Sequence, residues 1–233
     1  MSSPSSPLVV GIGGTMRAGS TSEQVLRLAL AAAERAGAET QLFAGTALNF
    51  PVYEPGNPTR SMAVLAMVGS LRRADGIIIA TSSYHGSISG FLKNALDYVE
   101  DMRDDPRPYF DGRAVGCIVC ADGAQSLGST LMALRSIVHA LRGWPTPFAA
   151  AINSRPSPFV GNAHSLPTEM LHSLDLVARQ VVEFAQMRRH YDSTRPQEFA
   201  TRTPLPLTAG ERWPQTAGDD ETDLTAIYGF INS

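Results

Sequence analysis

The sequence of 233 residues predicts an α/β fold, a three-layer sandwich in which helices cover both faces of a five-stranded parallel sheet. Three observations lead to this fold class. Short apolar runs alternate with longer segments whose apolar residues recur at helical spacing. The short runs are apolar throughout, which is typical of strands buried on both faces. Glycines and prolines separate the segments, so strand and helix follow each other in a repeated β–α order.

The first part of the chain supplies two strands and one helix. Leu8–Gly13 is a short apolar run that ends in glycine, as a buried strand often does. Thr21–Ala36 has its apolar residues on one helical face, and Gly37 follows as a helix-terminating residue. Glu39–Phe43 is a second, weaker strand. Ala44–Pro58 holds three prolines and two glycines, so we expect a loop there.

The middle of the chain continues the alternation. Thr59–Arg73 is expected to be a helix. Gly76–Thr81 contains three consecutive isoleucines and gives the clearest strand signal of the sequence. Gly90–Arg103 is expected to be a helix, and Ala114–Cys120 is another apolar strand.

The last elements complete the sheet. Leu127–Arg142 is an expected helix, Pro147–Ile152 a last short strand, and Ser165–Tyr191 a long helix. Right-handed crossovers between parallel strands then favour the flavodoxin-like strand order 2-1-3-4-5. We expect residues 1–191 to form this domain. Residues 192–233, with four prolines and scattered aromatic residues, are expected to form a C-terminal tail that docks on the chain itself or on a partner subunit.

Composition excludes several classes of protein. The net charge is −3 and the isoelectric point about 5.9, which argues against a nucleic-acid partner. The two cysteines, Cys117 and Cys120, lie three residues apart in an expected strand. Their side chains should point to opposite faces of the sheet, so they can form neither a disulfide with each other nor a shared metal site. We therefore expect two buried core thiols and no metal.

The sequence also indicates where the protein works. No apolar run approaches the roughly 20 residues that a membrane-spanning helix needs. Met1–Pro7 carries no Lys or Arg, so it does not resemble a signal peptide. We expect a cytoplasmic protein with no membrane partner.

The loop after the first strand, Gly11–Glu23, has the composition of a phosphate site. Ligands of such a sheet bind beyond the carboxyl ends of the strands, where the strand order reverses. This loop is rich in glycine, leads into a helix N-terminus, and offers one cation and four hydroxyl groups, from Arg17, Thr15, Ser20, Thr21 and Ser22. All of these groups suit a phosphate. Neither GK[ST] nor GxGxxG is present, and a loop rich in hydroxyl groups suits a phosphate monoester better than a bridging pyrophosphate.

Two further loops are expected at the same edge of the sheet. The loop after the third strand offers small polar groups and an aromatic wall, from Ser82, Ser83, Tyr84, His85, Gly86 and Ser87. The loop after the fourth strand adds Asp122 and Gly123. A serine hydrolase is disfavoured, because Ile88 stands where the GxSxG motif needs its serine. His85 is either a hydrogen-bonding residue or a general acid or metal ligand.

Two of these segments resemble motifs of the NAD(P)H-dependent FMN reductase family, whose fold is flavodoxin-like. Gly14–Ser20 is similar to the family's G-S-x-R-x-x-S phosphate loop, with Thr15 in place of the serine. Ser82–Asp97 is similar to its P-x-Y-[NH]-x-S-x-x-G-x-L-K-N-x-x-D segment, with Ser82 in place of the proline. The resemblance covers about residues 8–190, and Gly90–Asp97 is its most specific part.

The resemblance implies an activity and a set of binding residues. Hydride would pass from NADPH or NADH to FMN, and electrons would pass on to a flavin, a quinone or a similar small-molecule acceptor. The FMN phosphate would be held by Thr15, Arg17, Ser20 and Ser22. The isoalloxazine and ribityl groups would lie along Ser83, Tyr84, His85, Gly86 and Ser87, joined by Asp122 and Gly123. Such chemistry requires no side-chain acid or base, so the catalytic residues stay open. A homodimer or homotetramer is also implied.

Two other functions stay open on the same fold. In the first, bound FMN serves a specialised dehydrogenase that acts on a small aromatic or chorismate-derived biosynthetic intermediate. The unusual Ser82 and the long tail keep this alternative open. The second is a non-enzymatic FMN carrier, against which the low net charge of −3 and the extra C-terminal helix argue.

Overall fold

The computed structural model describes residues 6–155, 157–159 and 166–194. All of them belong to one unit, Met1–Thr194. The expected tail lies outside the described residues from residue 195 onward, and so does its expected docking.

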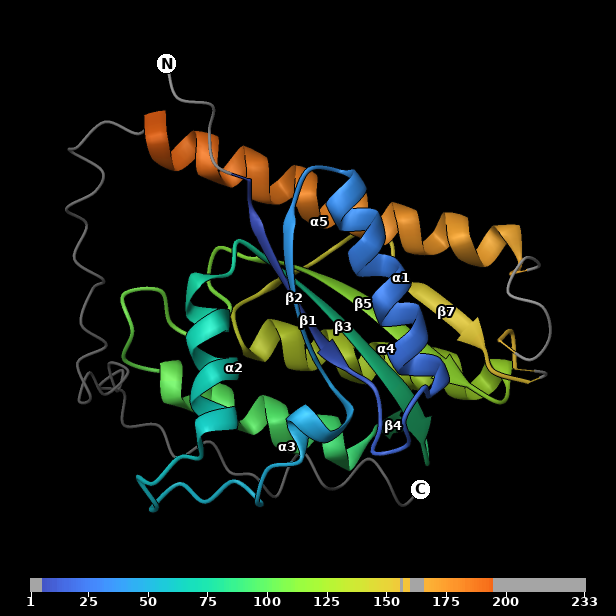
Figure 1. Ribbon diagram of the computed structural model, residues 1–233, viewed down its shortest axis with the longest axis horizontal. Coiled ribbons are helices and arrows are strands. Elements are labelled where there is room, and N and C mark those ends of the chain that lie inside the picture. The colour runs from blue at the N-terminus through green and yellow to red at the C-terminus, as the bar shows by residue number, and fades with distance from the viewer. Residues whose placement is uncertain (1–5, 156, 160–165, 195–233) are drawn as a thin grey trace, which may run out of the picture. The chain divides into compact units, whose positions relative to one another are not determined.

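Four parallel strands form the centre of the sheet, in the order β2-β1-β3-β5 (Figure 1). They are β1 (Leu8–Gly13), β2 (Glu39–Ala44), β3 (Gly76–Tyr84) and β5 (Ala114–Ala121). Every residue of β5 is buried, as a strand covered on both faces requires. This order confirms the predicted flavodoxin-like sandwich. It also places the reversal of strand order at β1 and β3, where such folds bind their ligands.

The predicted fifth strand, Pro147–Ile152, is wrong in its bounds. Two short pieces replace it, β6 (Trp144–Pro145) and β7 (Ala150–Asn153), and both pair in parallel with β5. Between them the chain leaves the ladder at Pro147, which has no N–H to donate. Its carbonyl accepts a hydrogen bond from Arg135 Nη2 at 3.0 Å instead of one from a strand.

Within the described residues, five α-helices cover the two faces of the sheet (Figure 1). On one face lie α1 (Thr21–Arg35) and α5 (Thr168–Thr194). On the other lie α2 (Met62–Arg73), α3 (Gly90–Asp97) and α4 (Ala124–Ala140). Each face has its own hydrophobic core, so the sheet is buried from both sides.

Alternate residues of the strands contribute to the two cores. Ile77 and Ile79 of β3 belong to the core beneath α2 and α4, whereas Ile78 belongs to the core beneath α1 and α5. The two cysteines divide in the same way: Cys117 lies in the first core and Cys120 in the second. Both are free and buried, as predicted, and they point to opposite faces.

Several predicted helices differ from the structure at their ends. The long helix predicted over Ser165–Tyr191 begins at Thr168 and runs on to Thr194, and α1 ends one residue earlier than predicted, at Arg35. Three further helices differ as follows. The first of them begins at Met62, not at Thr59, because Ser61 caps it by accepting a hydrogen bond from the Val64 N–H at 3.3 Å. The helix predicted over Gly90–Arg103 stops at Asp97 and continues as a 3₁₀ turn. The third corrected helix, α4, starts three residues earlier than predicted. The predicted loop after β2 also contains a short 3₁₀ turn.

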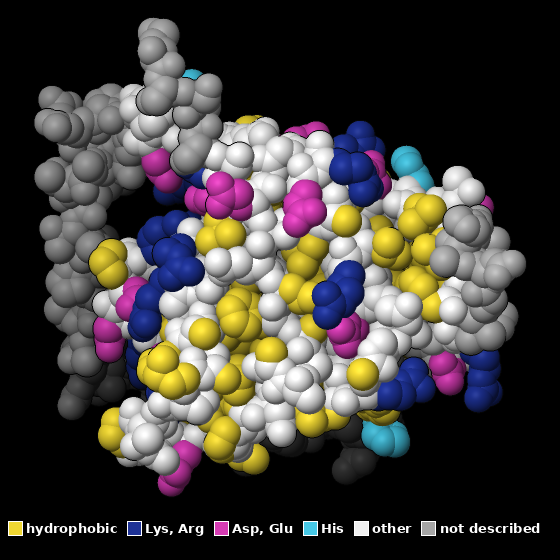
Figure 2. All heavy atoms as spheres, in the orientation of Figure 1, with side chains coloured by type: hydrophobic (Ala, Val, Ile, Leu, Met, Phe, Trp, Pro, Cys, Tyr) yellow, Lys and Arg dark blue, Asp and Glu magenta, His cyan; other side chains and the backbone are white. Residues whose placement is uncertain are grey.

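The described part of the chain contains no helix long and apolar enough to cross a membrane. On the face that Figure 2 shows, Lys and Arg side chains are interspersed with Asp and Glu side chains. This mixture of signs fits the net charge of −3.

Candidate functional site

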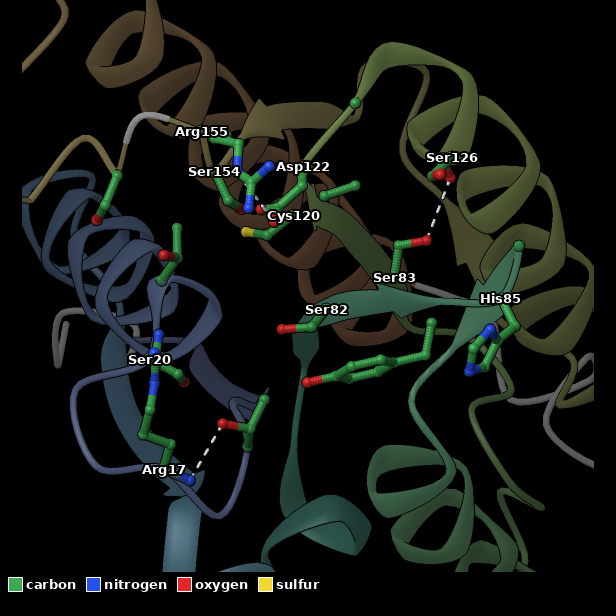
Figure 3. A pocket seen from close by; sticks show the side chains of 17 residues that line it. Arg17, Ser20, Ser82, Ser83, His85, Cys120, Asp122, Ser126, Ser154 and Arg155 are labelled. Carbon is green, nitrogen blue, oxygen red and sulfur yellow. Dashed lines mark hydrogen bonds and ion pairs between the residues drawn. The ribbon is translucent and has the colours of Figure 1, made fainter.

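Loops at the carboxyl ends of β1, β3, β5 and β7 enclose a pocket of about 970 Å³ (Figure 3). Most of the residues predicted from the sequence meet there: Thr15, Arg17, Ser20, Thr21, Ser82, Ser83, Tyr84, His85, Gly86, Asp122 and Gly123. Ser22 and Ser87 do not line the pocket. The fold therefore brings three separate loops of the sequence to one cavity, at the edge where the strand order predicts a ligand.

Two glycines let the chain turn closely from β1 into the pocket. A side chain at Gly13 would collide with the backbone carbonyl of Ala80 in the neighbouring strand β3. Gly14 follows with a φ of +86°, a conformation that L-residues other than glycine rarely adopt. Its N–H donates to the Ala80 carbonyl at 3.3 Å, which fixes the loop to β3.

The β1 loop ends in the cap of helix α1. The Ser20 hydroxyl accepts a hydrogen bond from the Glu23 N–H at 3.4 Å and so caps the first turn of the helix, and Ser20 and Thr21 of this helix N-terminus line the pocket. Thr15 Oγ1 accepts from the Arg17 N–H at 3.2 Å and shapes the turn before it. Among the described residues, no carboxylate pairs with the Arg17 guanidinium, and the side chain is exposed.

A buried contact joins this loop to β3. Ser22 is fully buried, and its hydroxyl lies 3.1 Å from the hydroxyl of Ser82 and 3.5 Å from that of Ser20. Ser22 thus stands behind the pocket wall, whereas Ser20 and Ser82 form part of it. The sequence reveals the hydroxyl groups but not this orientation, which depends on how α1 docks on the sheet.

Strand β3 leads into a hairpin that forms another wall. Its two-residue turn is His85-Gly86, and the short strand β4 (Ser87–Ile88) pairs back antiparallel, with Tyr84 opposite Ser87. Both turn residues have positive φ, 51° and 82°, as a type I′ turn requires. The hairpin holds His85 and the exposed Tyr84 at the pocket, and Figure 3 shows His85 on the side away from Arg17 and Ser20.

The hairpin is tied to helix α4. The Ser83 hydroxyl lies 2.7 Å from Thr130 Oγ1, and it lies 3.4 Å from the Ser126 carbonyl oxygen. Thr130 is fully buried, and its hydroxyl donates to the Ser87 carbonyl at 3.4 Å. Ser87 therefore takes part through its backbone carbonyl, in support of the hairpin rather than at the pocket surface.

The ends of β5 and β7 and the start of α4 close the pocket with residues that were not among the predicted site residues. These are Cys120, Ala121, Ser126, Ser154, Arg155 and Ser157. Arg155 Nε lies 3.6 Å from Asp122 Oδ2, and both side chains are largely exposed. A usable signal did exist, because Ser154 and Arg155 directly follow the last strand, which borders the fourth. Ser154, Arg155 and Ser157 stood outside the three loops that the strand-order rule singles out, whereas Ala121 and Ser126 belong to the loop after the fourth strand.

Ionisable groups are few in the pocket lining. Burial raises the pKa of the Cys120 thiol to about 12, so it stays protonated at neutral pH and is not an activated nucleophile. The fixed charges are the cations Arg17 and Arg155 and the anion Asp122, and the two latter neutralise each other. In the described part of the chain, no three His, Cys, Asp or Glu side chains are placed to hold a metal ion.

The two ends of the pocket differ in their chemistry. At the β1 end, an arginine without an acidic partner, several hydroxyl groups and a helix N-terminus converge, and this donor set fits a phosphate monoester. At the β3 and β5 end, hydroxyl groups, backbone of a tight hairpin and the Tyr84 ring offer neutral hydrogen-bonding and stacking groups. A ligand with a phosphate at one end and a flat, neutral ring system at the other fits both ends, and FMN is such a molecule.

Comparisons with known proteins agree with this chemistry. The sequence profile of the family described as NADPH-dependent FMN reductase matches residues 7–156. An FMN-dependent NADPH-azoreductase from Staphylococcus aureus is 42% identical over 74 residues, which are 32% of this chain and 36% of the relative. The matched segment thus spans about a third of the length of the curated relatives.

Solved structures share the fold at low sequence identity. FerB, a flavoenzyme NAD(P)H:(acceptor) oxidoreductase from Paracoccus denitrificans, superposes with a TM-score of 0.63 at 16% identity, covering 78% of this chain and 98% of the other. An NADH:FMN oxidoreductase in its apo form gives 0.56 at 20% identity, covering 76% and 90%. A WrbA-like flavodoxin from Agrobacterium tumefaciens gives 0.53 at 18% identity, covering 78% and 99%.

Proposed function

Because the chain belongs to the NADPH-dependent FMN reductase family, we propose that it is an FMN-dependent NAD(P)H oxidoreductase. It takes reducing equivalents from NADPH or NADH and delivers them to a flavin, a quinone or a similar small-molecule acceptor. One observation carries the proposal. The pocket lies where the strand order reverses and joins a cationic, hydroxyl-rich end to a neutral, ring-accepting end.

The residues divide between the two ends of the ligand. Thr15, Arg17, Ser20 and Thr21 would hold the phosphate, with Ser22 behind them. Ser82, Ser83, Tyr84, His85, Gly86, Asp122 and Gly123 would line the ribityl and isoalloxazine groups. Bound FMN supplies the capacity to accept a hydride and to pass on electrons.

The side chains of the pocket then bind and orient rather than transfer protons in an obligatory step. The turn His85-Gly86 fixes one edge of the ring site, because its two positive φ angles leave the hairpin little freedom. The Ser83–Thr130 hydrogen bond of 2.7 Å holds this hairpin against α4. A rigid wall of this kind would hold a flat ring system in one position in the pocket.

The visible spectrum of the purified protein tests the proposal, recorded before and after anaerobic addition of NADPH. A yellow protein whose flavin band bleaches supports the oxidoreductase. A yellow protein that NADPH and NADH both leave oxidised contradicts it, and indicates the specialised dehydrogenase or the FMN carrier. A colourless protein that neither binds added FMN nor oxidises NADPH excludes flavin chemistry at this pocket.

We also propose a homodimer or homotetramer in the cytoplasm. Met62 and Leu65, one helical turn apart on α2, are exposed by 79% and 48%, and apolar side chains of this size at a surface favour subunit contacts. The free thiols Cys117 and Cys120 suit a reducing compartment. A monomer mass in light scattering would contradict the assembly, and export of the tagged protein would contradict the compartment.

A further inference from the structure

The buried hydroxyl groups behind the phosphate loop form a continuous chain. Ser20, at the cap of α1, contacts Ser22 at 3.5 Å, and Ser22 contacts Ser82 of β3 at 3.1 Å. Ser22 is fully buried and lies outside the pocket lining, so its hydroxyl group has to find its partners within the protein, whereas the nearly buried Ser20 also borders the pocket. The two ends of the chain, Ser20 and Ser82, line the pocket, whereas its middle does not.

Counting donors and acceptors shows what this chain can do. Each hydroxyl group has one proton to donate and two lone pairs. Ser20 already accepts from the Glu23 N–H, and either atom can donate in each of the two hydroxyl contacts. If the chain donates from Ser20 towards Ser82, the spare proton faces the pocket at Ser82. If it donates in the opposite direction, the spare proton faces the pocket at Ser20.

A bound anion selects one of these two directions. A phosphate at the β1 end accepts the proton of Ser20, so Ser22 must donate to Ser20 and Ser82 must donate to Ser22. Ser82 then turns its lone pairs towards the pocket and can only accept from the ligand. The hydroxyl groups of a sugar alcohol are donors that suit such an acceptor, and linked hydrogen bonds strengthen one another.

We propose that Ser22 is a positioning residue that couples the phosphate end of the pocket to its polyol-and-ring end through Ser20 and Ser82. A ligand that carries both a phosphate monoester and hydroxyl donors binds cooperatively for this reason. The inference rests on the proposed function, because FMN is the ligand that joins the two groups. It also assigns a role to the Ser82 hydroxyl group, which the proline of the family motif at this position lacks.

A comparison of two flavins that differ only in the phosphate tests the coupling. Full-length protein is stripped of flavin, and the dissociation constants for FMN and riboflavin are measured by quenching of flavin fluorescence. The quantity of interest is the ratio of the riboflavin constant to the FMN constant. Wild type is compared with Ser22→Ala, Ser82→Ala and the double variant. Ser82→Pro adds the family residue, and melting curves verify that each variant is folded.

The coupling predicts a specific pattern. Ser22→Ala, which removes no group that lines the pocket, lowers the riboflavin-to-FMN ratio at least threefold and changes riboflavin binding less than twofold. Ser82→Ala and Ser82→Pro lower the ratio similarly, and the double variant lowers it no further than Ser22→Ala alone. Ser70→Ala is the matched control: it removes a buried helical serine hydroxyl on α2, outside the pocket lining, and leaves the ratio unchanged.

Other outcomes reject the inference or the function separately. If Ser22→Ala weakens FMN and riboflavin by the same factor, Ser22 is merely structural and the coupling is wrong. The same holds if the effects of Ser22→Ala and Ser82→Ala simply add. If Ser22→Ala does not fold, the coupling is tested by Ser82→Ala and Ser82→Pro alone. An unchanged ratio of the riboflavin to the FMN dissociation constant in both variants then rejects the coupling. If wild type binds neither flavin, the proposed function fails and the coupling fails with it.

Discussion

Replacement of Arg17 by glutamine tests the phosphate end of the pocket most directly. No carboxylate of the described residues pairs with this side chain, so a bound phosphate is its natural partner. A hydrogen bond to a charged group contributes about 1.5–3 kcal/mol. Arg17 is exposed, and solvent screening places its contribution to FMN binding at the lower end of this range. A loss of about 1.4 kcal/mol is a tenfold rise in the FMN dissociation constant.

The assay is again the quenching of flavin fluorescence, with riboflavin as the ligand that lacks the phosphate. Riboflavin binding should change by less than twofold in Arg17→Gln. The difference in FMN dissociation constant between wild type and Arg17→Gln should become smaller in about 1 M salt, because the Debye screening length falls to about 3 Å there. Arg155→Gln is the matched control, because Arg155 also lines the pocket and is exposed but already pairs with Asp122.

Two results would refute the reasoning. If Arg17→Gln weakens FMN and riboflavin equally, the arginine shapes the loop and does not contact a phosphate. If Arg155→Gln lowers FMN affinity more than Arg17→Gln does, the phosphate lies at the β7 end, and the assignment of the two ends must be reversed.

Three further predictions concern stability. Burial raises the pKa of Cys117 and Cys120 from 9.0 to about 12. The unfolded chain therefore loses these protons above pH 9 while the folded chain keeps them. The contribution of the two thiols to stability is fully present below pH 9 and is lost as the pH rises towards 12, and the loss is on the order of 4 kcal/mol at about pH 10.5. Above pH 9, the urea midpoint should fall less steeply with pH in the Cys117→Ala/Cys120→Ala variant than in wild type. An equally steep fall would contradict the assignment of this pH dependence to the two buried thiols. Arg113→Met should destabilise the protein by about 3–5 kcal/mol, because this fully buried guanidinium donates to four backbone carbonyls; a melting temperature within about 1 °C of wild type would contradict it. His85→Val should cost about 1–2 kcal/mol, because a β-branched residue tolerates the φ of 51° poorly, whereas His85→Asn should melt at or slightly above wild type; equal melting temperatures would refute the strain argument.

Strands β1 and β5 were predictable because each is apolar along its whole length, and β3 because it contains three consecutive isoleucines. The bounds of β1 agree with the prediction at both ends, since an apolar run and its terminal glycine mark them. The predicted helix over Gly90–Arg103 fails for a tertiary reason. Its apolar spacing continues, but the Tyr98 hydroxyl donates to the Pro51 carbonyl at 3.1 Å and its ring packs edge-on against Phe50. Contacts to a distant loop thus decide where the α-helix ends.

The composition of the loops was enough to predict which segments of the chain form the phosphate end of the candidate site. Glycine, hydroxyl groups and one arginine between a strand and a helix indicate a phosphate loop wherever the strand order reverses. Side-chain direction was not predictable in the same way. The Ser22 hydroxyl faces Ser82 because of the position in which α1 packs against the sheet. Arg155 reaches the pocket because β7 ends beside β5. Both facts follow from three-dimensional packing and have no local signature.

The balance of charge in the pocket favours a ligand with one phosphate. A phosphate monoester carries about −1.5 to −2 at neutral pH. Arg17 contributes one positive charge, and the N-terminus of α1 contributes the equivalent of roughly half a charge. These two sources almost neutralise a single phosphate at the β1 end. A dinucleotide would bring a further phosphate, and the only other arginine of the described lining, Arg155, is paired with Asp122. The pocket therefore suits FMN better than a flavin dinucleotide as its bound cofactor.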